Sequence, residues 1–230
     1  GLNLGTHLVA IERIVDANGC TNEKIASSND HISISITDVP KIHLLDSSAE
    51  CCVGDYVAYQ LSGNAPFNIR YEFNGAQLKL KEHTSQFVRL ASEPGTISIL
   101  SIGDATSQCV VDFRKQNMKK EFEKLSLLIH PIPSVTVSQG RNIVEDIHEG
   151  DQAEIIFSFE GSPPFSLTYV RTEEAEGTLG KGRPQIVETH KVTDIYSYEY
   201  KVVTSLQGTY EAIEISDAFC FAKNDAFFNH

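Results

Sequence analysis

Internal repetition is the feature of this chain that most restricts its fold. Three segments share one pattern, in which a Gly-Thr pair opens an alternating apolar stretch that ends in Asp-Ala and a cysteine. These segments begin at Gly5, Gly95 and Gly208 and reach Cys20, Cys109 and Cys220. A second pattern, Gly-x-[Ala/Pro]-Pro-Phe-x-[Ile/Leu]-x-Tyr, occurs over residues 63–71 and 161–169. Patterns that recur in a fixed order indicate one structural module used more than once.

The spacing of the repeats fits β-sandwich domains. Pro66 and Pro164 lie roughly 100 residues apart, which is typical of one sandwich and too long for a helical solenoid repeat. We predict the C-terminal strands of a preceding repeat over residues 1–37, a complete repeat over 38–131 and a second repeat over 132–230. The second repeat has no obvious counterpart of the last strand after its Asp-Ala-x-Cys element.

Within the repeats, apolar residues alternate with polar ones, as in half-buried strands. The period of two is clear at Val57, Tyr59 and Leu61, and again over residues 153–159. Gly, Pro, Asn and Asp separate such stretches, as turns between antiparallel strands require. We therefore predict an all-β fold of tandem immunoglobulin-like β-sandwich domains, arranged as an elongated string. The Lys- and Glu-rich segment from Arg114 to Lys124 is an exception, and both a short surface helix and a long charged hairpin fit it.

The recurring residues fit roles in folding rather than in chemistry. Glycine suits a corner with positive φ, and proline, which cannot donate to a ladder, suits the first residue of a strand. The aromatic residues that follow would share one buried face. The motif residues with a predicted structural role are Gly63, Pro66, Phe67, Tyr71, Gly95, Asp104, Gly161, Pro164, Phe165, Tyr169, Gly208, Tyr210 and Asp217. Prolines are also predicted to stiffen the joints between domains, at Pro40, Pro131 and Pro133.

The charge of the chain excludes one class of partner. Its 31 acidic and 19 basic residues give a formal net charge of −12, which disfavours nucleic acid because a phosphate backbone requires a basic face. Hydrophobic residues make up 41% of the chain, enough to form a buried core. No apolar stretch approaches the ~18 consecutive residues that a membrane span needs.

No catalytic, metal or cofactor motif is evident. The chain lacks Cys-x-x-Cys, His-Glu-x-x-His, Gly-x-Ser-x-Gly and a phosphate-binding glycine loop, and its histidines are scattered. Asp16, Asp104 and Asp217 recur at one point of the repeat, where calcium could bind between domains, but no further acidic cluster surrounds them. Turn formation explains these aspartates better. We therefore expect no catalytic residue, no metal site and no cofactor.

The five cysteines of the chain can indicate whether it resides in an oxidising or a reducing cellular compartment. In an immunoglobulin-like sandwich a disulfide joins an early strand to a late one, which predicts a bridge from Cys52, with Cys51 as the alternative, to Cys109. By the same alignment the partner of Cys20 lies in the preceding domain. Cys220 has no partner, because Ile147-His148 stands where the early cysteine would lie. A bridge would indicate an oxidising compartment, whereas five reduced core thiols would indicate a cytosolic protein.

Taken together, these motifs resemble the luminal immunoglobulin-like repeats of the large fungal pore-membrane nucleoporin, a protein of the membrane ring of the nuclear pore complex. The resemblance covers the chain from Gly5 to about Cys220 and is carried by Cys-x-Gly-Asp, by the Pro-Phe motif, by Gly-Thr-[Ile/Tyr] and by Asp-Ala-x-Cys. This chain departs from the pattern in its doubled Cys51-Cys52 and in the missing early cysteine of the last repeat.

The resemblance implies a structural, non-catalytic scaffold in the nuclear envelope lumen. Its partners would be other copies of the same protein, associated around the pore, and other nucleoporins. It would meet the membrane only through a transmembrane segment outside this fragment. Two other hypotheses remain: an immunoglobulin-like adhesion or carbohydrate-binding array of a secreted or cell-surface protein, and an accessory pair of β-domains from a large hydrolase.

Overall fold

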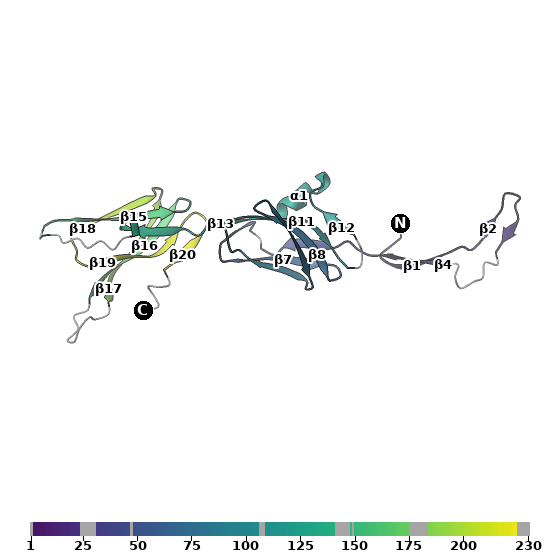
Figure 1. The fold of residues 1–230 in the computed structure, drawn as a ribbon, viewed down its shortest axis with the longest axis horizontal. Helices are drawn as coiled ribbons and strands as arrows, with labels where there is room; N and C mark the ends of the chain where they lie inside the picture. The colour runs from purple at the N-terminus through teal and green to yellow at the C-terminus, as the bar shows by residue number, and fades with distance from the viewer. Residues whose placement is uncertain are drawn as a thin grey trace. The chain divides into compact units, whose positions relative to one another are not determined.

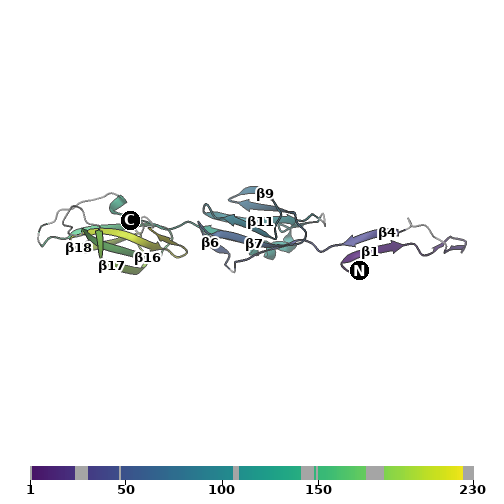
Figure 2. The ribbon, with the colours of Figure 1, turned by 90° about the horizontal axis from the view of Figure 1, so that it is seen from below.

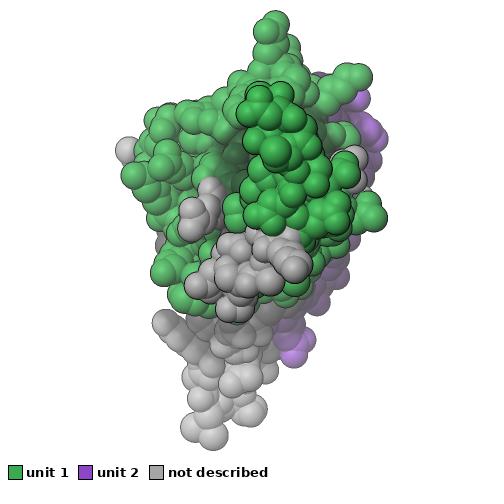
Figure 3. Space-filling view, turned by 90° about the vertical axis from the view of Figure 1, so that its right-hand side faces the viewer, with its two compact units in different colours: residues 1–47, 58–88, 97–126 green, residues 48–57, 89–96, 127–230 purple. Residues whose placement is uncertain are grey.

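The computed structural model describes residues 2–23, 31–46, 48–105, 109–140, 148, 150–174 and 184–224. Almost all of the regular structure in these residues is β-strand (Figure 1). The chain divides into two compact units, coloured separately in Figure 3. Unit 1 comprises residues 1–47, 58–88 and 97–126, and unit 2 comprises residues 48–57, 89–96 and 127–230. Because the units interleave in sequence, the predicted boundaries at 37/38 and 131/132 stay predictions.

The first part of unit 1 consists of two antiparallel pairs of strands. β1 (Gly5–Ala10) pairs with β4 (His31–Ile36), so that Gly5 lies opposite Ile36 and Ala10 opposite His31. β2 (Ile14–Val15) pairs with β3 (Thr21–Asn22). The strands β1 and β4 are rich in the β-branched residues that favour a pleated surface.

Two further sheets make up the core of unit 1, with a few terminal residues of their strands assigned to unit 2. One has the order β10-β7-β5, and in the other β11 pairs with both β8 and β12, while β8 also pairs with β9. The bounds are β5 (Lys41–Leu44), β7 (Tyr56–Ser62), β8 (Phe67–Phe73), β9 (Ala76–Glu82), β10 (Gln86–Leu90), β11 (Gly95–Gly103) and β12 (Val110–Asp112).

The predicted alternation in β7 is confirmed. Val57, Tyr59 and Leu61 are buried, whereas the intervening side chains are only partly buried. The ring of Phe87 stacks on Tyr59 at 5.7 Å and packs against Tyr71 at 5.4 Å, so one aromatic side chain joins the two sheets of unit 1. Phenylalanine and tyrosine thus fill this core, and the chain contains no tryptophan.

The segment from Arg114 to Lys124 forms helix, so the alternative of a hairpin is wrong. A single 3₁₀ turn, η1 (Gln116–Met118), leads into α1 (Lys119–Lys124). Leu125, which follows the helix, is buried, and its carbonyl oxygen accepts a hydrogen bond of 3.1 Å from the Tyr59 hydroxyl. Lys and Glu have good intrinsic helix propensity, and Leu125 anchors the end of the segment in the core. Within the described residues, no helix is long and apolar enough to cross a membrane.

Unit 2 contains a sandwich of two sheets, whose strands are seen in Figures 1 and 2. One sheet has the order β14-β15-β18 and the other β17-β16-β19-β20, while β6 pairs in parallel with β13. The 3₁₀ turn η2 (Ser138–Gly140) follows β14. The strand bounds are β6 (Glu50–Cys52), β13 (Ser126–His130), β14 (Ser134–Val137), β15 (Ala153–Glu160), β16 (Phe165–Glu174), β17 (Pro184–Ile195), β18 (Glu199–Thr204), β19 (Thr209–Ser216) and β20 (Phe221–Lys223).

Aromatic side chains from β15 and β16 meet in the core of this sandwich. The rings of Phe159 and Phe165 lie 5.0 Å apart, and those of Phe157 and Tyr169 lie 5.1 Å apart. Leu167, between the two β16 aromatics, is fully buried, as the shared face predicted for the Pro-Phe motif requires. The fold is therefore all-β with immunoglobulin-like sandwich architecture.

Candidate functional site: the recurring corner and the disulfide pocket

The Pro-Phe motif and the Asp-Ala motif come together in one corner of unit 1. Gly63 has φ +135°, and a Cβ added there would lie 3.0 Å from Oδ2 of Asp104, 3.2 Å from Phe67 and 3.4 Å from Pro40. The carboxylate of Asp104 accepts a hydrogen bond from the backbone amide of Asn64 at 3.2 Å. Four predicted structural residues and a joint proline thus make one packed cluster, in which the peptide before Pro66 is cis.

Unit 2 contains the same corner built from the equivalent residues. A Cβ added at Gly161, with φ +137°, would lie 2.7 Å from Oδ2 of Asp217 and 3.2 Å from both Phe165 and Pro133. Asp217 accepts a hydrogen bond of 2.9 Å from the amide of Ser162, and the peptide before Pro164 is cis, like its counterpart. The sequence repeat therefore reflects a repeated three-dimensional cluster, in which only glycine leaves room for the carboxylate.

The recurring aspartates hold the turns that follow them. Oδ1 of Asp217 accepts hydrogen bonds from the amides of Phe219 at 2.9 Å and Cys220 at 2.7 Å. Oδ1 of Asp16 likewise accepts from the amide of Cys20 at 2.9 Å. These carboxylate oxygens are satisfied by backbone donors, as expected for turn formation. Among the described residues, no cluster of three or more His, Cys, Asp or Glu side chains could hold a metal ion.

The remaining predicted residues lie at other points of the two units. Gly95 and Gly208 have positive φ values of +151° and +141°. A Cβ at Gly208 would approach the carbonyl oxygen of Thr172 to 2.7 Å, so this glycine permits a close strand contact. The Tyr210 hydroxyl lies 2.8 Å from that of Thr204. Pro40 and Pro133 are buried in the two corners, whereas Pro131 is exposed.

The predicted disulfide from Cys52, or alternatively Cys51, to Cys109 is wrong. Cys52 is bonded to Cys220, with their Cα atoms 5.9 Å apart, so the expectation that Cys220 lacks a partner is also wrong. The strand β6 brings Cys52 beside His130 at the end of β13, and the Asp217 turn brings Cys220 to the corner that contains Pro133. Cys109 is not bonded to Cys52; it comes shortly after Asp104, a residue of the unit 1 corner. Ile147 of the expected cysteine position lies outside the described residues.

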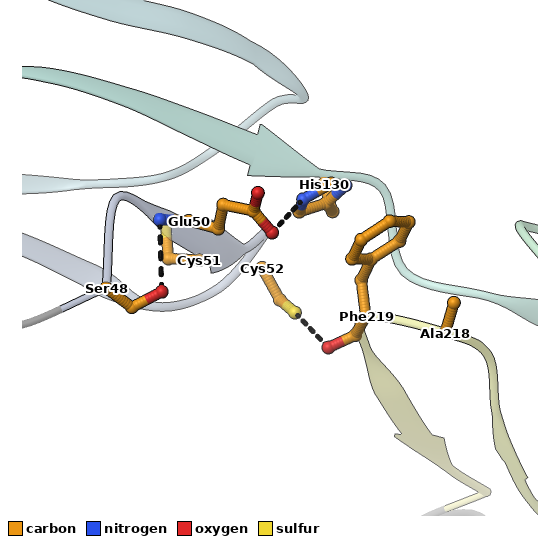
Figure 4. Close-up of a pocket in the computed structure, with 7 residues that line it drawn as sticks. All are labelled: Ser48, Glu50, Cys51, Cys52, His130, Ala218 and Phe219. Carbon is orange, nitrogen blue, oxygen red and sulfur yellow. Dashed lines mark hydrogen bonds and ion pairs between the residues drawn. The ribbon is translucent and has the colours of Figure 1, made fainter. Parts of the chain in front are cut away.

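Seven residues of unit 2 line a pocket beside this disulfide (Figure 4). They are Ser48, Glu50, Cys51, Cys52, His130, Ala218 and Phe219. The His130 and Phe219 rings are stacked with centroids 3.9 Å apart, and Nε2 of His130 lies 3.2 Å from a carboxylate oxygen of Glu50. Sγ of Cys52, which carries no hydrogen in the disulfide, lies 3.6 Å from the carbonyl oxygen of Phe219. The ring stack and the covalent bond thus fasten the 217–220 turn to β13 and β6, while the His130–Glu50 contact joins β13 to β6.

Sequence reasoning missed His130, Glu50 and Phe219 as members of one site. His130 was interpreted as one of several scattered histidines, and its stacking partner lies 89 positions further along the chain. One signal was present: the turn before Cys220 carries an aromatic residue, Phe219, where the turn before Cys20 has Asn18-Gly19. In the structure Phe219 is about half exposed, and its ring is the one that stacks on His130.

A second polar network of unit 2 joins β16, β17 and the start of β19. The buried guanidinium of Arg171 donates to Glu188 at 2.9 Å and to the carbonyl oxygen of Gln207 at 2.7 Å, and it also pairs with Glu173. These hydrogen bonds raise the pKa of Arg171, and the guanidinium, followed by His190, holds the pKa of Glu188 below its usual value. Since two carboxylates already neutralise Arg171, the network is suited to fastening strands rather than to binding an anion.

The tyrosine next to this network is enclosed by other side chains. The ring of His190 stacks on Tyr169 at 4.9 Å, and Nε2 of His190 lies 3.0 Å from Glu188. Burial, followed by the nearby Tyr200 and Tyr210 hydroxyls and Glu188, raises the pKa of Tyr169. A phenol with a raised pKa stays neutral at pH 7, which suits its place in the core.

Comparison with known proteins gives a consistent result. Residues 40–120 match the family model described as the ninth immunoglobulin-like domain of Pom152-like nucleoporins. The whole chain is 70% identical over 230 residues to nucleoporin POM152 of Saccharomyces cerevisiae, and 98% of it is 38% identical to nucleoporin pom152 of Schizosaccharomyces pombe. The chain spans 17% of the length of each of these relatives.

Similarity to solved structures is weak. The FN1–FN3 domains of chicken CNTN1 share 11% identity, with 88% of this chain and 67% of that chain covered and a TM-score of 0.26.

Proposed function

We propose, on the premise that this chain belongs to the immunoglobulin-like repeat region of the Pom152-like nucleoporins, that it is a luminal part of a scaffold. In this proposal the repeats lie in the space between the two nuclear membranes, associate with other copies around the pore and help to anchor the nuclear pore complex. The family is a structural, non-catalytic one. The observation that carries the proposal is the 70% identity to nucleoporin POM152 over the full chain.

The Cys52–Cys220 disulfide supports the luminal placement. Disulfides persist in oxidising compartments and are rare in the cytosol, where thiol reductants keep cysteines reduced. The two cysteines are 168 positions apart, and the bond joins β6 to the 217–220 turn. We expect this disulfide to be present whenever the protein is folded, unlike an incidental bridge between two surface cysteines.

Peptide mapping of the parent protein, isolated from cells with its thiols blocked at lysis, tests this placement. We expect the peptide containing Cys52 to be linked to the one containing Cys220 in most molecules. Protease treatment of intact nuclear envelopes should leave these peptides uncut until the membranes are permeabilised. Free thiols at both positions, or cleavage without permeabilisation, would contradict a luminal location.

The packing of the repeats supports a mechanical role. Each corner brings a glycine, a proline, a phenylalanine and an aspartate close together, and the aspartate accepts a hydrogen bond from a backbone amide. Association between copies is tested by sedimentation of the 230-residue chain over a wide range of concentrations. We expect concentration-dependent dimers or larger species. A chain that stays monomeric at several hundred micromolar would remove the self-association from the proposal.

A further inference from the structure

The edge strand β18 exposes an unusual amount of apolar surface. Four large side chains along this strand and its flanks are between 51% and 70% exposed: Tyr196, Tyr198, Val203 and Leu206. In its sheet, β18 pairs with β15 on one side, and the order β14-β15-β18 places it at an edge among the described strands. An exposed, apolar edge strand is a template for pairing with another strand.

The other edges in the sandwich of unit 2 are less suited to pairing. β14 has four residues and β20 three. β17 is longer, but it begins at Pro184, has register irregularities against β16 and includes Asp194 at a positive φ of +58°. Prolines, bulges and short length are the features by which edge strands avoid pairing. In β18 the register against β15 is continuous from Glu199 to Thr204.

The hydrogen bonds of β18 define which backbone groups face outward. The amide of Phe159 donates to the carbonyl oxygen of Tyr198 at 2.8 Å, so the main chain of Tyr198 is directed at β15. Because main-chain groups alternate along an antiparallel strand, those of Glu199, Lys201 and Val203 are directed at the open edge. Only residues of this odd-numbered set can exchange backbone hydrogen bonds with a new strand.

From this geometry we propose that β18 pairs antiparallel with β18 of a second copy of this chain, about a two-fold axis at Tyr200. In this register Glu199 of each copy lies opposite Lys201 of the other, which gives two complementary charge pairs on the solvent face of the sheet. The next register, shifted by two positions, places Lys201 opposite Lys201. Charge therefore selects one register and offsets part of the repulsion between two chains of net charge −12.

The same pairing covers the exposed apolar side chains. Tyr198 comes to lie opposite Val202, and Val203 comes to lie opposite Ser197 of the other copy. Tyr196 lies at the end of the paired segment, where its ring can cover the neighbouring strand. This inference rests on the proposed self-association and names the surface that performs it, which includes the exposed Val203 of β18 and Tyr198 beside it.

Charge substitutions test the pairing by sedimentation of the whole 230-residue chain. E199K leaves an edge with two lysines and K201E an edge with two glutamates, so each variant alone should dimerise about tenfold more weakly or worse. An equimolar mixture of the two should associate as well as wild type, because both lysines of the E199K copy then face glutamates of the K201E copy. V203P should also weaken the dimer, since it removes an outward amide while leaving the β15 ladder intact.

K191E on β17 is the matched control, because it makes the same charge change on another edge strand and should leave the dimer unchanged. Circular dichroism and thermal melting show whether each variant is folded, which matters most for K201E because Lys201 also pairs with Glu154 of the same chain at 3.0 Å. If wild type self-associates but E199K, K201E and V203P associate equally well, this pairing is wrong while the scaffold proposal stands. If wild type is monomeric at every concentration, the proposed self-association itself fails.

Discussion

Gly161 has no room for a side chain in the unit 2 corner. An added Cβ would lie 2.7 Å from the Asp217 carboxylate and 3.2 Å from the rings of Phe165 and Pro133, at a φ of +137°. G161A should therefore combine backbone strain with displacement of a carboxylate that caps the Ser162 amide. We expect a loss of about 2–4 kcal/mol in the free energy of unfolding, measured in urea by tyrosine fluorescence.

Gly150 is the matched control for this substitution. Its φ is +94°, but an added Cβ would have no atom within 4 Å. G150A should cost only the backbone strain of a left-handed alanine, about 1 kcal/mol. Equal losses for the two variants would show that the corner is not closely packed.

For single residues, the sequence was informative where the residue type favours one backbone conformation or one structural role. Glycine at positive φ and aspartate in a turn could both be expected from their own chemistry, whereas Pro66 and Pro164 come immediately before their strands rather than at the first strand position. The stacking of His130 on Phe219 could not be expected in this way, because neither histidine nor phenylalanine prefers one particular partner residue. Contacts between exposed side chains distant in sequence depend on the tertiary fold.

The strand pair β16 and β17 depends on an ion pair as well as on its backbone ladder. Hydrogen bonding from Arg171, and secondarily from His190, lowers the pKa of Glu188 below its usual value of 4.5. A depressed carboxyl pKa in the folded state stabilises the fold at pH values above the unfolded pKa, and this contribution is lost as the pH falls through the folded pKa. The Arg171–Glu188 pair should therefore stabilise the sandwich at pH 7 and contribute progressively less as the pH falls below 4.5.

E188Q tests this dependence. The variant should have a lower urea midpoint than wild type at pH 7, and the difference should shrink steadily as the pH is lowered below about 4.5. E174Q, at the exposed end of the same strand pair, provides the comparison. A difference between E188Q and wild type that stays constant from pH 7 to pH 3 would contradict an ionic contribution from Glu188.

Elements with a strict alternation were predicted well, and the charged segment 114–124 was not. In β7 the period of two directly gives the buried residues Val57, Tyr59 and Leu61. In the segment that contains α1, Lys and Glu are compatible with helix and with an exposed hairpin, and Leu125, which follows it, is buried. That burial is a property of the neighbouring strands and cannot be seen in the segment itself.

At the scale of the whole chain, the disulfide was the principal error of the sequence analysis. The immunoglobulin template assigns a bridge to one sandwich, and that assumption paired Cys52 with Cys109. The Asp217 turn instead holds Cys220 beside the corner that contains Pro133, and Cys220 is bonded there to Cys52 of β6. A periodic pattern locates a cysteine within its repeat but does not say which repeat holds its partner.

The Cys52–Cys220 bond should restrict the connector between β13 and β14. It closes a loop of 168 positions, and the chain-entropy model assigns a loop of this size about 5 kcal/mol, of which measured bridges commonly deliver about 2–4. C220S should therefore melt at a lower temperature than wild type without reductant, and reduced wild type should match it. Hydrogen exchange should accelerate over residues 130–134 in C220S, because the stacked Phe219 is no longer tethered.

C20S, which replaces an exposed cysteine and leaves the bond intact, should behave like wild type. Identical melting of C220S and oxidised wild type, with unchanged exchange at 130–134, would show that this bridge has no mechanical role.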